Sequence, residues 1–132
     1  MIIEQAILTE LNTTAGLTAL VGQRIYYTKA PQDVLEPYIV FIKVSSIRNH
    51  SYTGSSHFAE SRFQFSIYST TYAETKTIAK QLQTILECTS GNIGTAPGVD
   101  VGAIYYDNET DLFEPETRLY HLACDYLILH YD

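Results

Sequence analysis

One stretch of the sequence, residues 107–111 (DNETD), spaces acidic oxygens as the first turn of a calcium-binding loop does. A loop of that kind continues with glycine, which permits its sharp turn, and closes with a glutamate that binds the ion through both oxygens. Leu112 and Arg118 stand at those two places. The sequence therefore predicts a solvated acidic turn between strands, with no bound metal.

The four histidines do not form a metal-binding group in sequence. His121 and His130 fall on one predicted strand but on opposite faces, about 30 Å apart at roughly 3.3 Å per residue. His50 and His57 flank a polar segment and could approach each other, yet no cysteine or carboxylate cluster accompanies them to complete a zinc site. We expect no zinc and no other cofactor.

Hydrolytic and nucleotide-binding chemistry are disfavoured on similar grounds. His121 and Asp125 share a strand face but lie about 13 Å apart, beyond hydrogen-bond reach, and no Gly-x-Ser-x-Gly motif supplies a nucleophile. The segment Gly91–Gly94 lacks the lysine and the strand-to-helix context of a phosphate-binding loop. Lys76 and Lys80 lie one turn apart on the exposed face of a predicted helix, where they are ordinarily only solvated. The sequence predicts a protein that is not an enzyme.

The elements that position these residues are clearest between Phe58 and Leu86. From Ala59 to Ile67 apolar and polar residues alternate, which is typical of a half-buried strand. Thr71 and Glu74 match a capping box, and apolar residues then recur at helical spacing. We expect a helix packed on a sheet, with a core that includes Ile7, Leu11, Phe63, Phe65, Ile67, Ile78, Leu82 and Ile85.

The rest of the chain supplies one more main helix and further strands. Ile3 to Leu11 has an amphipathic helical pattern, followed by a short helical turn that ends near Gly22. The expected strands are Arg24–Thr28, Tyr38–Ile47, Ala59–Ile67, Val99–Tyr106 and Leu119–Tyr131, with Thr89–Gly98 as a loop and Asp107–Glu116 as an acidic connection. The element order α-β-β-β-α-β-β predicts an α+β fold, an antiparallel β-sheet with two main helices packed on one face.

Residues 48–57 separate two of these strands and are small and polar, apart from His50, Tyr52 and His57. This predicts a long β-hairpin loop, since a tight hairpin needs only about two residues. The added length has two explanations. The loop is a docking element for a neighbouring subunit, or it is an idle surface loop, because long insertions cost little closure entropy.

Composition places limits on partners and compartment. At 132 residues the chain is expected to be a single domain, 1–132, without a membrane-spanning segment. Fifteen acidic and eight basic residues give a net charge of −7, which disfavours tight binding to nucleic acid. With no signal peptide, Cys88 and Cys124 are expected to be free thiols in a reducing compartment. Eleven tyrosines and no tryptophan suit strands and wet protein interfaces alike.

A series of short motifs in a fixed order resembles the tail-completion, or tail-to-head joining, proteins of long-tailed bacteriophages. The motifs are Leu20-Val21-Gly22, Arg24-Ile25-Tyr26, Ala30-Pro31-Gln32, the segments 37–41 (PYIVF) and 65–69 (FSIYS), and Arg118 with His121 and Asp125. They extend over nearly the whole chain. The segments Thr89–Gly98 and Asp107–Glu116 do not align with the family.

The resemblance implies a small α+β structural subunit without catalytic residues or cofactors. It implies a homo-oligomeric ring, by similarity a hexamer, at the head-proximal end of the tail. The implied partners are the tail tube protein and the head-completion or connector protein, with DNA passing through the ring and no membrane involved. The implied location is the tail or neck of the virion, after assembly in the host cytoplasm.

Candidate contact residues follow from the polar hairpin segment, the exposed lysines and the acidic connection. They are Arg48, His50, Tyr52, His57, Lys76, Lys80, Asp107, Glu109 and Asp111. A second class of function remains open from the residues alone, a small-molecule or peptide-binding α+β module without catalysis. Self-association would distinguish the two, because a ring-forming subunit associates with itself and a binding module remains a monomer.

Overall fold

The fold is given by a computed structural model. It describes residues 2–32, 34–51, 54–87, 89–95 and 98–131, and for residues 49–51 and 54–57 it describes the backbone alone. The helices are α1 (Ile3–Asn12), α2 (Ala15–Val21) and α3 (Tyr72–Glu87). The strands are β1 (Ile25–Tyr27), β2 (Tyr38–Ser51), β3 (Gly54–Ser69), β4 (Gly91–Ile93), β5 (Val99–Glu114) and β6 (Leu119–Tyr131).

The strands form a six-stranded sheet in the order β1-β2-β3-β6-β5-β4. The α+β class is as the sequence predicts, but the sheet is mixed, because β1 pairs with β2 in parallel and the other neighbours pair antiparallel. The prediction of an antiparallel-only sheet was wrong. The predicted element order also lacked α2 as a full helix and β4, which lies inside the segment expected to be a loop. The three residues of β4 carry too little side-chain pattern to be recognised as a strand without their partner β5.

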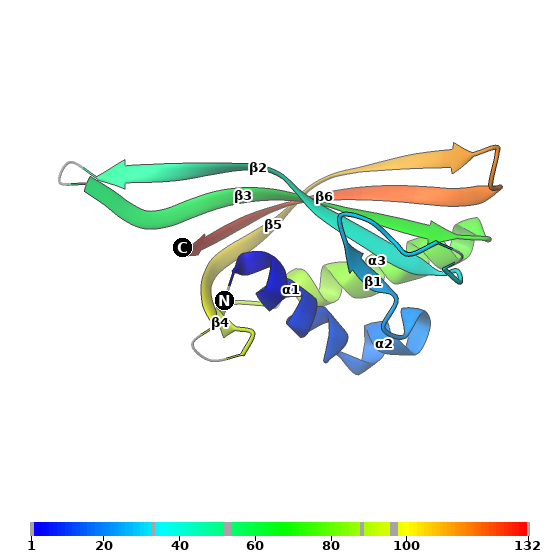
Figure 1. The fold of residues 1–132 in the computed structure, drawn as a ribbon, viewed down its shortest axis with the longest axis horizontal. Helices are drawn as coiled ribbons and strands as arrows, with labels where there is room; N and C mark the ends of the chain where they lie inside the picture. Colours follow the sequence, from blue (N-terminus) through cyan, green and yellow to red (C-terminus); the bar gives the residue numbers. More distant parts are fainter. Residues whose placement is uncertain (1, 33, 52–53, 88, 96–97, 132) are drawn as a thin grey trace.

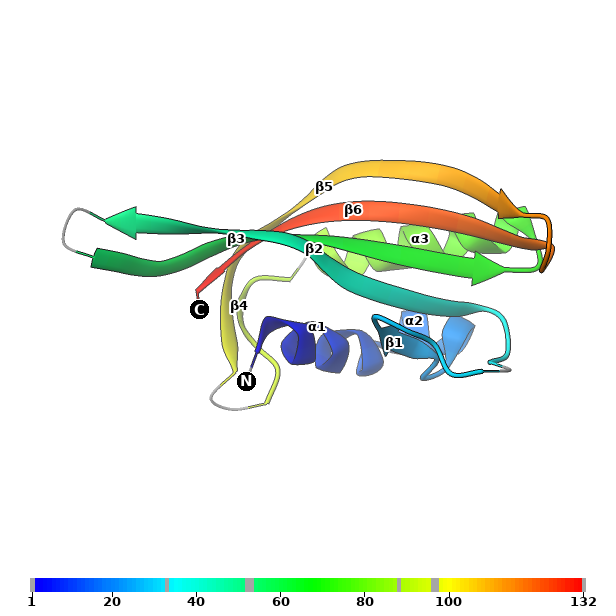
Figure 2. The ribbon, with the colours of Figure 1, turned by 45° about the horizontal axis from the view of Figure 1, so that its top comes forward.

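Figure 2 shows the helices on one side of the curved sheet, with α3 running beneath β3, β6 and β5. The alternation read from Ala59 onward is confirmed, because residues 59, 61, 63, 65, 67 and 69 are buried and those between them are half-buried. Of the predicted core, Ile7, Leu11, Phe63, Phe65, Ile67, Ile78 and Leu82 are fully buried, and Ile85 is partly buried against them. The helix-on-sheet core is therefore as the sequence predicts.

The segment 48–57 is not a long loop, and this prediction was wrong. Backbone pairs continue along it, joining Arg48 to Ala59, His50 to Ser55 and Ser51 to Gly54. Only Tyr52 and Thr53 separate the two strands. Figure 1 shows this β2–β3 ribbon extending beyond the rest of the sheet. A two-stranded ribbon has no buried face to impose apolar alternation, so its polar sequence gave no strand signal.

The acidic connection is likewise mostly strand. β5 continues to Glu114 and pairs with β6 along that length, from Val101 opposite His130 to Glu114 opposite Leu119. Residues 115–118 form the turn, where Arg118 has a positive φ of 58°. Acidic residues are depleted in strands as a class, but here the ladder to β6 outweighs that weak preference.

Cys124, on the helix-covered side of β6, is a free and buried thiol, and burial raises its pKa to about 12. Cys88 lies outside the described residues. Across the part of the chain that the structure describes, no helix is both long enough and apolar enough to span a membrane.

Candidate assembly surfaces

The predicted contact residues fall in two regions at opposite ends of the sheet. Arg48 is exposed on β2, where the β2–β3 ribbon leaves the body of the sheet. The side chains of His50 and His57 and the whole of Tyr52 lie outside what the structure describes. The remaining residues, Lys76, Lys80, Asp107, Glu109 and Asp111, lie on α3 and β5.

Lys76 joins α3 to the acidic part of β5 within one chain. Its Nζ lies 2.8 Å from Asp111 Oδ1 and 3.5 Å from Glu109 Oε1. Tyr72, one turn earlier on α3, donates its hydroxyl to Asp111 Oδ2 at 2.8 Å. Two of the candidate contact residues of the acidic segment, Glu109 and Asp111, are thus already bound to Lys76 of their own chain. Lys80, one turn further along α3, is exposed.

These contacts have opposite effects on the two titratable groups. The hydrogen bond with Asp111 is the main cause that raises the pKa of Lys76. Hydrogen bonds from Lys76 and then Tyr72 lower the pKa of Asp111 below its ordinary value of 3.8. A carboxyl group with a lowered pKa stabilises the fold above its ordinary pKa, and this contribution is lost as pH falls through the lowered value. The side chains are 36% and 50% exposed, so the energy involved is small.

Asp111→Asn is therefore expected to destabilise the chain by less than about 1 kcal/mol near neutral pH. The amide retains an acceptor for Tyr72 but loses the charge that Lys76 binds. The difference in thermal midpoint from the wild type should shrink as pH is lowered from neutral through 3.8 and below, where the native carboxyl also becomes neutral. Glu116→Gln, an exposed carboxylate in the β5–β6 turn, is the control and should show no such trend. A constant difference between pH 7 and about pH 2 would contradict the assignment.

Asp107 takes part in a separate ion pair on the face of the sheet that the helices do not cover. Arg62 of β3 reaches over β6 to hydrogen-bond and pair with the Asp107 carboxylate. The two side chains are 37% and 46% exposed. This contact links strands that are not adjacent in the sheet.

A polar chain runs between three strands, with Ser61 and His130 buried on the covered face and Ser46 exposed. Ser46 of β2 and Ser61 of β3 lie 3.2 Å apart at their Oγ atoms, and Ser61 Oγ lies 2.7 Å from His130 Nε2 of β6. Burial is the main cause that lowers the pKa of His130, which favours the neutral ring. A serine at a core position of the β3 alternation was the signal for this network, which sequence reasoning missed. Its role is structural.

A row of stacked rings crosses the open face near the β5–β6 turn. The Tyr38 and Tyr68 rings stack at 4.9 Å between centroids, and Tyr68 stacks on His121 at 4.4 Å. Burial lowers the pKa of His121, and its Nε2 is buried without a hydrogen-bond partner among the described residues. Two of the eleven tyrosines, Tyr38 and Tyr68, therefore take part in ring contacts between neighbouring strands.

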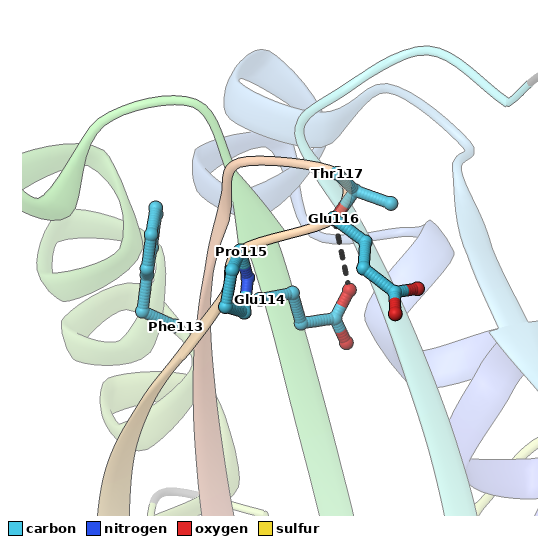
Figure 3. Close-up of a pocket in the computed structure, with 5 residues that line it drawn as sticks. All are labelled: Phe113, Glu114, Pro115, Glu116 and Thr117. Carbon is cyan, nitrogen blue, oxygen red and sulfur yellow. Dashed lines mark hydrogen bonds between the residues drawn. The ribbon is translucent and has the colours of Figure 1, made fainter.

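Figure 3 shows a shallow recess formed by the β5–β6 turn itself, lined by Phe113, Glu114, Pro115, Glu116 and Thr117. Glu114 and Glu116 extend to one side of the turn and Phe113 to the other. The Thr117 hydroxyl donates to Glu114 at 3.0 Å. Within the described ranges, no three histidine, cysteine or acidic residues are grouped so that they could hold a metal ion.

The β2–β3 ribbon and the face of the sheet that the helices leave uncovered are therefore the candidate assembly surfaces. The sequence of the whole chain can be compared with those of known proteins. The family model for tail completion protein gp17 matches residues 5–131. The chain belongs to this family. It is a structural phage tail protein and a component of the virion. Membership favours a structural role over the alternative of a small-molecule or peptide-binding module.

The fold also resembles that of a chain in a solved structure titled "Virion of native gene transfer agent (GTA) particle". The TM-score is 0.82 at 15% sequence identity, and the match covers 98% of this chain and 95% of that chain. At that identity the likeness concerns the fold. Among curated proteins, none matches the sequence.

Proposed function

We propose that this chain forms a ring, a hexamer, that closes the head-proximal end of the phage tail and joins it to the head connector. The observation that carries the proposal is the family match over residues 5–131, because the family is one of tail completion. The ring's partners are the tail tube protein on one side and the head-completion or connector protein on the other. Subunits fold in the host cytoplasm and end in the neck of the virion.

The charge of the chain suits a ring through which DNA passes. A net charge of −7 repels a phosphate backbone, so the ring would not hold DNA tightly during packaging or ejection. The proposal assigns the subunit no catalytic step and no cofactor.

The β2–β3 ribbon is proposed as the arm that contacts an adjoining subunit or the next ring. Beyond the pair between Phe58 and Tyr131, β3 has only β2 as a partner among the described residues. A two-stranded ribbon alone is marginally stable in water, so packing on a neighbour would stabilise it. His50, Tyr52 and His57 belong to this arm, and Arg48 lies at its base.

Deleting the gene from the phage or prophage that encodes the chain tests the joining role. The lysate should contain filled heads and separate tails by electron microscopy, because each half assembles but the junction is missing. Supplying the wild-type chain from a plasmid should restore joined particles. Joined, infectious virions without the chain would contradict the proposal.

The same complementation tests the arm. A chain in which residues 49–56 are replaced by Asn-Gly should fold with an unchanged thermal midpoint, since the replaced ribbon lies outside the core, but should not restore joined particles. Thr84→Ala, on the exposed face of α3 and outside the candidate contact residues, is the matched surface control for folding and expression. Wild-type yield from the shortened chain would show that the arm is dispensable.

A further inference from the structure

The β2–β3 ribbon leaves the sheet at a place where the backbone ladder alone does not fix its direction. The last rung between β3 and β6 joins Phe58 to Tyr131. Beyond that rung β3 has only β2 as a partner among the described residues, and the β2–β3 ladder is interrupted at residues 43–45 and again at residues 48–50. Such irregularities bend a strand and change its local twist. The direction of the ribbon therefore depends on side-chain contacts at its base.

The polar chain of Ser46, Ser61 and His130 lies at that base. Ser46 lies between the two interruptions of β2 and is paired with Ser61 of β3. His130 is paired with Ala59, one rung before the β3–β6 ladder ends, and Figure 1 shows the C-terminal end of β6 near the start of the ribbon. The chain thus joins three strands through side chains where the ribbon begins.

The hydrogen bonds of His130 define which ring nitrogen carries a proton. Nδ1 lies 3.2 Å from the backbone carbonyl oxygen of Tyr131, which can only accept, so Nδ1 donates. In the neutral ring Nε2 then has a lone pair and accepts from the Ser61 hydroxyl at 2.7 Å. Ser61 Oγ in turn accepts from the Ser46 hydroxyl. The neutral ring therefore ends an ordered row of hydroxyl groups.

A proton on Nε2 would add a positive charge to a site that disfavours one, since His130 is only 2% exposed. The charged groups that face the ring are Lys43 and Arg48 from β2 and Glu4 from α1, and β3 and β5 place the apolar Ala59 and Val101 beside it. Glu4 Oε1 already pairs with Lys43 Nζ at 2.8 Å. Burial is the main cause that holds the pKa of the ring below its ordinary value of 6.5, and the two cations add to it.

The cost of protonation is the buried charge rather than lost hydrogen bonds. A protonated Nε2 can donate to Ser61, and Ser61 can then donate to Ser46. The charge is relieved when the ring reaches water. The ring reaches water if the base of the ribbon separates from the end of β6, and a two-stranded ribbon is only marginally stable by itself.

We propose that His130 is a positioning residue for the arm: its neutral ring holds the base of the β2–β3 ribbon, through Ser61 and Ser46, in the direction needed for docking, and protonation releases the ribbon. The inference rests on the proposed arm and adds the residues that aim it. The pKa of the ring is lower in the folded than in the unfolded chain. The hold is therefore complete above 6.5 and is lost as pH falls from there through the lowered value.

Hydrogen exchange of the purified chain, at a concentration at which it is a monomer, tests the hold. For amides within residues 44–51 and 54–58, the rate of an unfolded peptide at the same pH is divided by the observed rate, so that only protection is compared. Protection should fall at least about threefold between about pH 7.5 and about pH 5. His130→Gln should remove this fall, because the glutamine oxygen also accepts from Ser61 but does not titrate in this range.

The other ionisable groups near the ribbon need controls. His121→Gln removes the second histidine of β6, which lies on the opposite face of the strand, and should leave the fall in protection unchanged. The side chains of His50 and His57, and the whole of Asp132, lie outside the described residues. The fall should therefore also persist in His50→Gln with His57→Gln and in Asp132→Asn.

Ser61→Ala tests the hold without altering the titrating ring. It removes the link between His130 and Ser46, so ribbon protection should be at least about threefold lower already at about pH 7.5. Wild-type protection that is equal at the two pH values, an undiminished fall in His130→Gln, or wild-type protection in Ser61→Ala would each overturn the inference.

The complementation assay separates this inference from the joining role itself. His130→Gln should restore joined particles, whereas Ser61→Ala should yield at least about tenfold fewer, because an arm that is not held in direction docks poorly. Wild-type yield from Ser61→Ala would show that the hold does not aim a docking arm. The gene deletion decides the joining role independently, and the exchange measurements decide the hold whether or not the chain joins heads to tails.

Discussion

Replacing Phe65 by alanine should lower the free energy of unfolding by about 3–5 kcal/mol, the largest effect expected of a single side chain here. The ring is fully buried at the centre of β3. It stacks on Phe41 at 5.3 Å between centroids and meets Tyr126 edge-on at 5.5 Å. Removing it leaves a cavity between the sheet and α3, and the energy rises with the volume that neighbours fail to fill.

Gln64→Ala is the matched control, because Gln64 is the preceding residue and lies half-buried on the opposite face of the same strand. It should cost less than about 1 kcal/mol. Both variants are compared by urea unfolding, with the slope of the transition checked to be equal. Equal stability of the two variants would contradict the assignment of Phe65 to the face of the sheet that the helices cover.

Gly98→Ala should destabilise the chain by more than the 1–2 kcal/mol or so that a left-handed backbone alone costs a side chain. Gly98 has a φ of +70° at the start of β5. A Cβ atom there would also lie 2.6 Å from the carbonyl oxygen of Ile93, in β4, and closer still to the Asn92 side chain. The backbone oxygen cannot rotate away, so the β4–β5 hairpin would have to shift.

Gly91→Ala separates the two causes, because Gly91 has a φ of +78° but no atom within 4 Å of an added Cβ. It should show the cost of the backbone angle alone. The measurement is the difference in thermal midpoint between the two variants. A smaller loss for Gly98→Ala than for Gly91→Ala would contradict the contact with Ile93.

The arrangement of the candidate surfaces depends on pairing that no local signal contains. The sequence predicts an acidic turn at residues 107–111. In the structure these residues are part of strand β5, and an ion pair between Lys76 and Asp111 links them to α3. Val44 and Ile47 belong to the strand expected at Tyr38–Ile47, yet both are exposed, because β1 covers β2 only as far as Phe41. Which strand lies at an edge is a property of the whole sheet.

The sequence by itself determined the α+β class, the core and the family. The core was predictable because the period-2 pattern of β3 and the helical period of α3 each place apolar residues on one face. Burial of those faces is the main driving force of folding. The family was readable from the order of short motifs. Tertiary structure alone decided the parallel β1–β2 pair, the end of that pairing at Phe41, and the extension of β2 and β3 into the ribbon. These features are made by backbone hydrogen bonds between distant segments, and the backbone is the same for every residue type except proline.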